Sequence, residues 1–226
     1  MSQEKREIVI PSQLLGDVKS KNAGRGTYVE NGKIYAEVVG VLNTTSKYIS
    51  VTPLKGGYSP KENDFVIGVV IEPMASSWLV DINAPYPALL HVNEVPWRVD
   101  FGETEKYLNA GDTVMAKVSQ VDEEKKLQIT LKERNLYKIK GGNIINASPS
   151  KVRRIRGKND SMTAIIKKYT KCRMFVGDNG RIWIDGSYEA IKKVKEVINI
   201  IEEESIYYGL TNKIEKILKK DAKDVH

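Results

Sequence analysis

The sequence predicts a multidomain protein with a small N-terminal β domain, a central five-stranded β-barrel and a C-terminal α+β domain. Three patterns predict this order: β-branched residues punctuated by glycine, then five short strand-like segments without a long helix, then mixed helical and strand periodicity. We expect domains over residues 1–60, 61–136 and 137–207, with a helix or tail over residues 208–226. The chain has 226 residues, of which 41% are hydrophobic, and this is enough for several packed cores.

A tight hairpin is the clearest feature of the N-terminal domain. Asn31-Gly32 is the strongest short hairpin signal, and strand-like segments at residues 27–30 and 33–39 flank it. Residues 48–51 continue the β pattern. Gly24-Arg25-Gly26 precedes the first clear strand, and it is either a plain turn or a contact loop for a partner.

Five short strands are expected in the central domain. They lie at residues 65–72, 78–83, 88–92, 113–121 and 126–132. In the last of them, Leu127, Ile129 and Leu131 face one way while the polar residues between them face the other. Trp78 alternates with apolar neighbours in the second strand, which places its ring in the core. Five such strands indicate a small Greek-key barrel of the OB type.

Helices and strands follow the order β-α-α-β-β-α in the C-terminal domain. A strand at residues 142–146 leads to Ser148-Pro149, which is expected to begin the first helix. The later elements are a helix at residues 161–169, strands at 173–176 and 181–184, a long helix capped by Ser187, and a cationic helix at 210–220. The apolar side chains of the long helix recur with the 3.6-residue period at Ala190, Ile191, Val194, Val197, Ile198 and Ile201.

The net charge of +7 belongs to the C-terminal part of the chain. From Lys138 onward there are 20 Lys and Arg against 11 Asp and Glu, a net +9, whereas residues 1–137 carry 16 against 18. Residues 151–173 alone contain nine basic side chains and one acid, Asp160. Such a patch indicates a polyanionic partner such as a nucleic acid, or else a solvated surface.

Several function classes lack support in the sequence. The single cysteine, Cys172, excludes an internal disulfide and a zinc site with several thiolates, and we expect it to be a small buried residue. Without a leader-like N-terminus or an apolar run of about 20 residues, the protein is expected to be cytoplasmic and to have no membrane partner. Only two histidines and no catalytic motif are present, so we expect no enzyme activity, no catalytic residues, no cofactor and no metal.

The barrel resembles the S-one domain, an RNA-binding module. The resemblance covers about 75 residues and rests on residues 88–91, Gly111-Asp112, residues 118–122 and residues 127–131. It implies that single strands bind through base stacking on aromatic rings and through basic side chains along the phosphates. Ser76 and Leu79 stand where the family has aromatic residues, so we expect binding mainly through charge. The expected RNA contacts of the barrel are His91, Lys117, Lys126 and Lys132. The alternative for His91 is a surface or core histidine whose hydrogen bonds are made within the protein.

The C-terminal domain resembles the KH domain of the eukaryotic type. In that family, a Gly-x-x-Gly turn between two short helices lets the backbone approach the phosphates of about four nucleotides. Here the turn is Gly157-Lys158-Asn159-Asp160, and the acid in place of the second glycine is expected to cap the next helix. The expected RNA contacts of this domain are Arg153, Arg154, Arg156, Gly157 and Lys158.

A second turn carries the most specific resemblance. Gly177-Asp178-Asn179-Gly180, followed by Arg181-Ile182-Trp183-Ile184, is similar to the KH domain of RNA-binding cap subunits of the exosome, with Gly177, Asn179 and Gly180 as marker residues. Gly26-Thr27-Tyr28 and residues 78–83 fit the same family. The chain is therefore identified as a member of the exosome cap subunits, and its size and compact three-domain layout favour the archaeal branch.

The resemblance implies a non-catalytic role with two partners. Three copies of the cap are expected on a hexameric ring of RNase-PH-like subunits, which degrades RNA from the 3′ end by phosphorolysis. The caps hold single-stranded RNA and guide it into the ring, and the N-terminal domain is expected to dock on it. The alternatives are a free-standing RNA-binding factor of translation and a nuclease in its own right.

Overall fold

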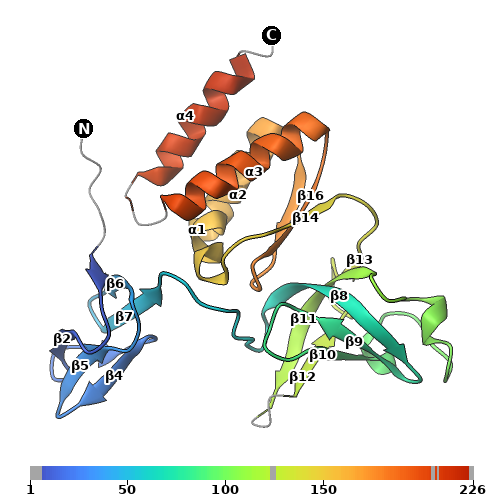
Figure 1. Ribbon diagram of the computed structural model, residues 1–226, viewed down its shortest axis with the longest axis horizontal. Helices are drawn as coiled ribbons and strands as arrows, with labels where there is room; N and C mark the ends of the chain where they lie inside the picture. The colour runs from blue at the N-terminus through green and yellow to red at the C-terminus, as the bar shows by residue number, and fades with distance from the viewer. Residues whose placement is uncertain (1–6, 123–125, 205–206, 208, 224–226) are drawn as a thin grey trace.

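The computed structural model forms three domains, which Figure 1 shows at three corners of the molecule. It describes residues 7–122, 126–204, 207 and 209–223. The N-terminal domain and the barrel occupy the two lower corners of the view, and the α+β domain stands above them. Among the described residues, no helix is long and apolar enough to cross a membrane.

Two small sheets make up the N-terminal domain. Its strands are β1 (Ile8–Val9), β2 (Leu14–Asp17), β3 (Asn22–Ala23), β4 (Thr27–Glu30), β5 (Lys33–Ala36), β6 (Gly40–Thr44) and β7 (Tyr48–Pro53). One sheet has the order β1-β6-β7-β3 and the other β2-β5-β4. The predicted hairpin is confirmed, because β4 pairs with β5 and both turn residues, Asn31 and Gly32, have positive φ. A small core of Val9, Ala36 and Val51 holds the strands together.

The central domain is a closed five-stranded barrel, as predicted. Its strands are β8 (Phe65–Met74), β9 (Ser77–Asp81), β10 (Ala88–His91), β11 (Thr113–Val121) and β12 (Leu127–Thr130), with 3₁₀ turns η1 (Val92–Glu94) and η2 (Thr104–Lys106). The sheet runs β12-β10-β9-β8-β11, and the pairing of β12 with β11 closes it. The short strand β13 (Tyr137–Lys138) pairs antiparallel with the first half of β11. Trp78 is fully buried, and its Nε1 donates to the carbonyls of Thr104 and Leu108.

The C-terminal domain has the predicted β-α-α-β-β-α order. It contains β14 (Asn143–Asn146), η3 (Pro149–Lys151), α1 (Val152–Arg156), η4 (Lys158–Asp160), α2 (Ser161–Thr170), β15 (Arg173–Val176), β16 (Arg181–Asp185), α3 (Tyr188–Glu203) and α4 (Leu210–Lys223). Its sheet has the order β14-β16-β15. Ser187 caps α3 by accepting a hydrogen bond from the Ala190 amide. Ser148 stands at the predicted N-cap position with Pro149 first after it, but the turn that follows is 3₁₀ and the Ser148 hydroxyl contacts Ser150 rather than capping a backbone amide.

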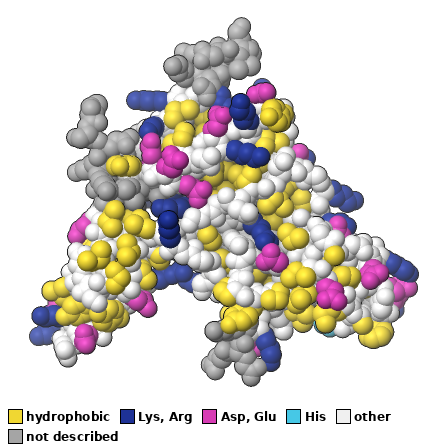
Figure 2. All heavy atoms as spheres, viewed as in Figure 1, with side chains coloured by type: hydrophobic (Ala, Val, Ile, Leu, Met, Phe, Trp, Pro, Cys, Tyr) yellow, Lys and Arg dark blue, Asp and Glu magenta, His cyan; other side chains and the backbone are white. Residues whose placement is uncertain are grey.

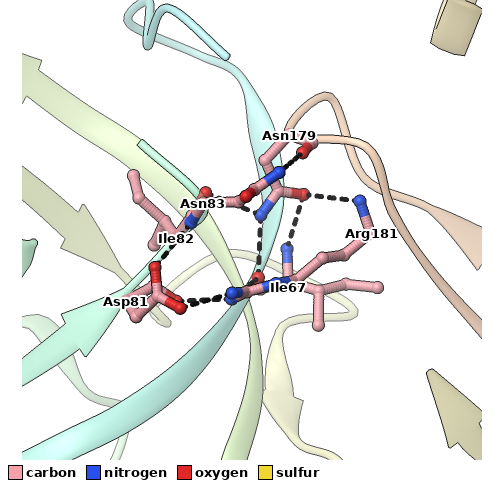
Figure 3. A network of polar contacts seen from close by, with 6 residues as sticks. All are labelled: Ile67, Asp81, Ile82, Asn83, Asn179 and Arg181. Atoms are coloured by element: carbon pink, nitrogen blue, oxygen red, sulfur yellow. Dashed lines mark hydrogen bonds and ion pairs between the residues drawn. The ribbon is translucent and has the colours of Figure 1, made fainter. Parts of the chain in front are cut away.

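The turn Gly177-Asp178-Asn179-Gly180 joins the α+β domain to the barrel (Figure 3). Asn179 is 0% exposed, and its amide group donates to the carbonyls of Ile67 (2.8 Å) and Ile82 (2.9 Å). Its Oδ1 also accepts from the Ile67 amide, and Asn83 donates to the Asn179 carbonyl. Because β9 pairs with β8 only from Val69 onward, Ile67 is open on that side, and Asn179 satisfies both of its backbone groups.

Charged side chains complete this junction on either side of Asn179. Arg181 donates to the Asp81 carbonyl at 2.6 Å and pairs with the Asp81 carboxylate (Figure 3). Burial alone would raise the pKa of Asp81, but hydrogen bonds from Arg181 and the Asn83 amide hold it below its ordinary value. Asp178 exchanges two hydrogen bonds with the backbone of Phe65. The barrel and the α+β domain therefore share buried polar contacts as well as apolar ones.

The two glycines of the turn are required by its closeness to neighbours. A Cβ at Gly177 would lie 2.4 Å from Asn179 Oδ1, and one at Gly180 would lie 2.3 Å from the Ala147 carbonyl oxygen. Gly180 also has φ +84°, a backbone conformation that other residues rarely adopt. Gly177, Asn179 and Gly180, predicted as marker residues, are thus the residues that shape the domain junction.

We expect Asn179→Ala to lower the free energy of unfolding by about 2–3 kcal/mol, because the Ile67 amide and the Ile82 carbonyl lose their bond to the side chain, while the Ile67 carbonyl keeps its bond from Arg181. Urea unfolding followed by far-UV circular dichroism measures the change. The matched control is Asn199→Ala on the exposed side of α3, which should leave stability nearly unchanged. Equal stability of the two variants would contradict a structural role for the buried amide.

Candidate nucleic-acid interface

The predicted barrel contacts are not all available to a ligand. Lys117 on β11 pairs with Glu133 at 2.5 Å, lies 5.8 Å from the centre of the Phe65 ring, and has a side chain only 18% exposed. His91 ends β10, and its Nδ1 accepts a hydrogen bond from the Asn93 amide, which caps η1. Both side chains therefore have structural partners within the domain.

Lys126 and Lys132 are exposed at the two ends of β12. The β11–β12 register places Lys117 opposite Thr130 and Val121 opposite Leu127. Lys117 and Lys126 consequently lie at opposite ends of this ladder, and the structure does not gather the three lysines into one cluster. Lys126 and Lys132 are the more exposed of the three.

Two of the predicted arginines hold the α+β domain together. Arg156 donates to the Val176 carbonyl and pairs with Asp178 at 2.7 Å. Arg154 donates to the Tyr207 carbonyl at 2.6 Å. Arg153 and Lys158, in contrast, are exposed around the turn after α1. The sequence shows only the density of basic residues in this segment and does not separate internal from exposed ones.

The turn at Gly157 keeps a left-handed backbone despite its missing second glycine. Gly157, Asn159 and Asp160 have φ of +74°, +51° and +59°. A Cβ at Gly157 would lie 2.7 Å from the Met162 amide nitrogen, so the first glycine is needed. The expected helix cap by Asp160 is wrong: its side chain makes no capping bond, and its carbonyl accepts from the Thr163 hydroxyl instead. Asp160 is exposed, two residues after the exposed Lys158.

Arg153 also lines a pocket of about 200 Å³ where the three domains meet. Arg25 from the N-terminal domain and Lys61, which precedes β8, line it as well. The pocket contains two carboxylates, of which Asp64 accepts hydrogen bonds from the Tyr58 hydroxyl and the Lys61 amide. Burial raises the pKa of both Asp64 and Tyr58. The Gly24-Arg25-Gly26 loop was visible in the sequence, but its position near Arg153 follows only from the tertiary structure.

Each of the three domains matches a known family. Residues 6–55 match the N-terminal domain of the exosome RNA binding protein RRP4, residues 59–132 match the S1 (S-one) RNA binding domain, and residues 142–189 match the KH domain. The chain is 44% identical over 216 residues to the exosome complex component Rrp4 of Methanosarcina mazei. This alignment covers 96% of this chain and 83% of the relative.

The chain belongs to the Rrp4 family of exosome components.

Further relatives agree with this membership. The Rrp4 protein of Picrophilus torridus is 41% identical over 217 residues, covering 96% of this chain and 94% of the relative. The crystal structure of a protein described as an exosome complex RNA-binding protein superposes with a TM-score of 0.67 at 31% identity, covering 76% of this chain and 100% of that one. The predicted family, its archaeal branch and the three-domain fold are confirmed. The Rrp4 relatives are named as components of the exosome complex, and the matched N-terminal and S1 domains are named for RNA binding.

We expect Asp160→Gly to strengthen the binding of single-stranded RNA by a few-fold. The change removes a negative charge from the turn that also carries Lys158, and it replaces a non-glycine residue at φ +59° by glycine. Fluorescence anisotropy with a labelled oligoribonucleotide measures the affinity, and Asp160→Ala, which removes the charge but not the backbone strain, is the companion variant. Weaker binding by a more stable Asp160→Gly protein would remove this turn from the RNA interface.

Proposed function

We propose that this chain is a non-catalytic RNA-binding subunit of the exosome, which binds single-stranded RNA as a cap and guides it into a phosphorolytic 3′-to-5′ exoribonuclease ring. The observation that carries the proposal is the match to Rrp4 proteins over 96% of the chain, with all three domains in order. It acts in the cytoplasm, and a separate enzyme degrades the RNA that it binds.

Exposed basic side chains on the two RNA-binding domains support the RNA part of the proposal. Lys126 and Lys132 lie on the barrel, and Arg153 and Lys158 lie on the α+β domain. The phosphates of a single strand attract such side chains over distances of about 10 Å. Because the junction at Asn179 fixes the two domains to one another, one strand can contact both without ordering a linker.

An apolar face of the N-terminal domain supports docking on the ring. Leu14, Tyr35 and Tyr28 lie in register across the three strands β2, β5 and β4. The Tyr28 and Tyr35 rings stack 5.5 Å apart, and Leu14 is 53% exposed. Figure 2 shows hydrophobic side chains gathered over this domain. Exposed apolar patches of this kind mark protein interfaces, and we assign this one to a hexameric ring of RNase-PH-like subunits that carries three copies of the chain.

Association with the ring is the test of the proposal. The purified chain mixed with ring subunits should co-elute in gel filtration, and the measured mass should correspond to three copies per ring. Leu14→Glu with Tyr28→Glu should abolish co-elution, whereas the matched control Phe101→Glu on the barrel, at a residue 83% exposed, should not. RNA binding without any association would favour the free-standing translation factor, and RNA decay by the chain alone would favour a nuclease.

We expect Arg153→Glu combined with Lys158→Glu to weaken single-stranded RNA binding at least tenfold and to reduce the slope of log affinity against log salt by about 1.4, since each phosphate contact contributes about 0.7. Anisotropy titrations at several salt concentrations measure both quantities. The control, Lys192→Glu combined with Lys195→Glu, places the same charge change on exposed positions of α3. Equal effects of the two pairs would show that only overall charge matters.

A further inference from the structure

A groove of about 570 Å³ lies between the barrel and the α+β domain, apart from the turn at Gly157. The barrel side is formed by β8, β11 and the segment around β13, and the other side by α2, β15 and β16. Its volume is within the range of pockets that hold small organic ligands. No residue predicted from the sequence to contact RNA lines this groove.

Aromatic rings from both domains line the groove. Tyr137 pairs with Met115, and Met115 pairs with Ile67, so these residues share the outer face of the barrel with Phe65. Phe65 is 36% exposed and Tyr137 is 43% exposed, although both belong to strands that pack against the rest of the barrel. Phe175 and Trp183 line the groove from the other domain. Exposed rings beside buried ones provide surfaces on which a planar group can stack.

Three cations complete the lining, and none of the described residues that line the groove is acidic. They are Arg134, Lys167 and Arg173. Arg173 lies 5.7 Å from the centre of the Trp183 ring and pairs with Asp185, which is outside the lining. Within the described part of the chain, Arg134 and Lys167 have no ion-pair partner among the recorded contacts. The groove therefore offers stacking surfaces surrounded by positive charge.

We propose that this groove holds one or two unstacked bases of single-stranded RNA, with the flanking phosphates on Arg134, Lys167 and Arg173. The inference rests on the proposed RNA-binding function and assigns it a second contact surface. Stacking on aromatic rings next to basic side chains is how proteins hold single strands with little sequence preference. Ser76, just before β9, and Leu79 on β9 stand where the related family has stacking residues, and Phe65 and Tyr137 supply rings elsewhere on the same barrel.

The two walls of the groove are fixed before RNA binds. Phe65 exchanges two backbone hydrogen bonds with Asp178, and Ile67 is held by Asn179. Both contacts join β8 directly to the turn between β15 and β16. A preformed groove does not lose the entropy of ordering its walls when a ligand binds. An acidic peptide would meet the same cations, but a peptide does not require the two exposed rings.

Replacement of the rings tests the stacking. Phe65→Leu combined with Tyr137→Leu keeps apolar side chains in the strands, and it should weaken binding of a labelled single-stranded oligoribonucleotide about tenfold. The control is Phe101→Leu combined with Tyr188→Leu, which removes two more exposed rings outside the groove, at residues 83% and 78% exposed. Thermal unfolding of each variant confirms that the fold is intact.

An oligoribonucleotide with consecutive abasic positions separates stacking from charge. The wild-type chain should bind it about tenfold more weakly than the intact strand, and the Phe65/Tyr137 variant should bind both strands equally. Arg134→Gln combined with Lys167→Gln should reduce the salt slope by about 1.4 for either strand.

The outcomes distinguish this groove from the function on which it rests. A wild-type chain that binds no RNA contradicts the proposed function itself. If the wild-type chain binds RNA and the Phe65→Leu/Tyr137→Leu variant binds it equally well, the proposed role of the groove is wrong, while the proposed function stands. Retained RNA binding together with lost association with the exosome ring would assign the groove to a protein and would also overturn the proposal.

Discussion

The amide group of Asn179 is the contact on which the arrangement of the RNA-binding domains depends. The first residues of β8 have one edge without a strand partner, since β9 joins it only from Val69 onward. An unpaired backbone amide or carbonyl buried at a domain interface would cost about 1–3 kcal/mol. Asn179 removes this cost for Ile67 and at the same time bonds to Ile82, so one side chain bonds to β8 and to the residue that follows β9. The close approach to Asn179 and Ile67 explains Gly177, whereas Gly180 is required by its positive φ and by the Ala147 carbonyl of its own domain.

The same junction decides which basic residues can meet RNA. Asp178, which lies in the turn, forms an ion pair with Arg156, and Arg181 forms an ion pair with Asp81. Lys117 is held by Glu133 in the barrel. A cation paired inside the fold must give up its partner before it can bind phosphate, whereas an exposed one such as Lys158 has only to shed water. The net charge of the C-terminal region therefore overstates the number of side chains that can contact a strand.

Local patterns in the sequence predicted the elements well, and long-range contacts account for what they missed. Asn31-Gly32 and Ser187 act on residues within a few positions, so their signals were sufficient for a hairpin and a helix cap. Ser148 had the same cap signal, but Pro149 begins a 3₁₀ turn and the hydroxyl finds Ser150. Asn179 was recognised as part of a marker turn, yet its partner Ile67 is 112 residues away. No periodicity in either segment encodes that contact, and the groove beside it is equally invisible in the sequence.

The placement of the apolar and basic surfaces fits a protein that works between two partners. The exposed apolar face of the N-terminal domain, with Leu14 and Tyr28, belongs to a domain with a core of its own. The basic residues and the exposed rings of Phe65 and Tyr137 lie on the two domains that Asn179 joins. A strand held by the joined pair would have a fixed position relative to both of its contact surfaces. Under the proposal that the N-terminal domain docks on the ring, the orientation of the joined pair depends on the contacts between the domains, and the pocket lined by Arg25, Lys61 and Arg153 lies where the three domains meet.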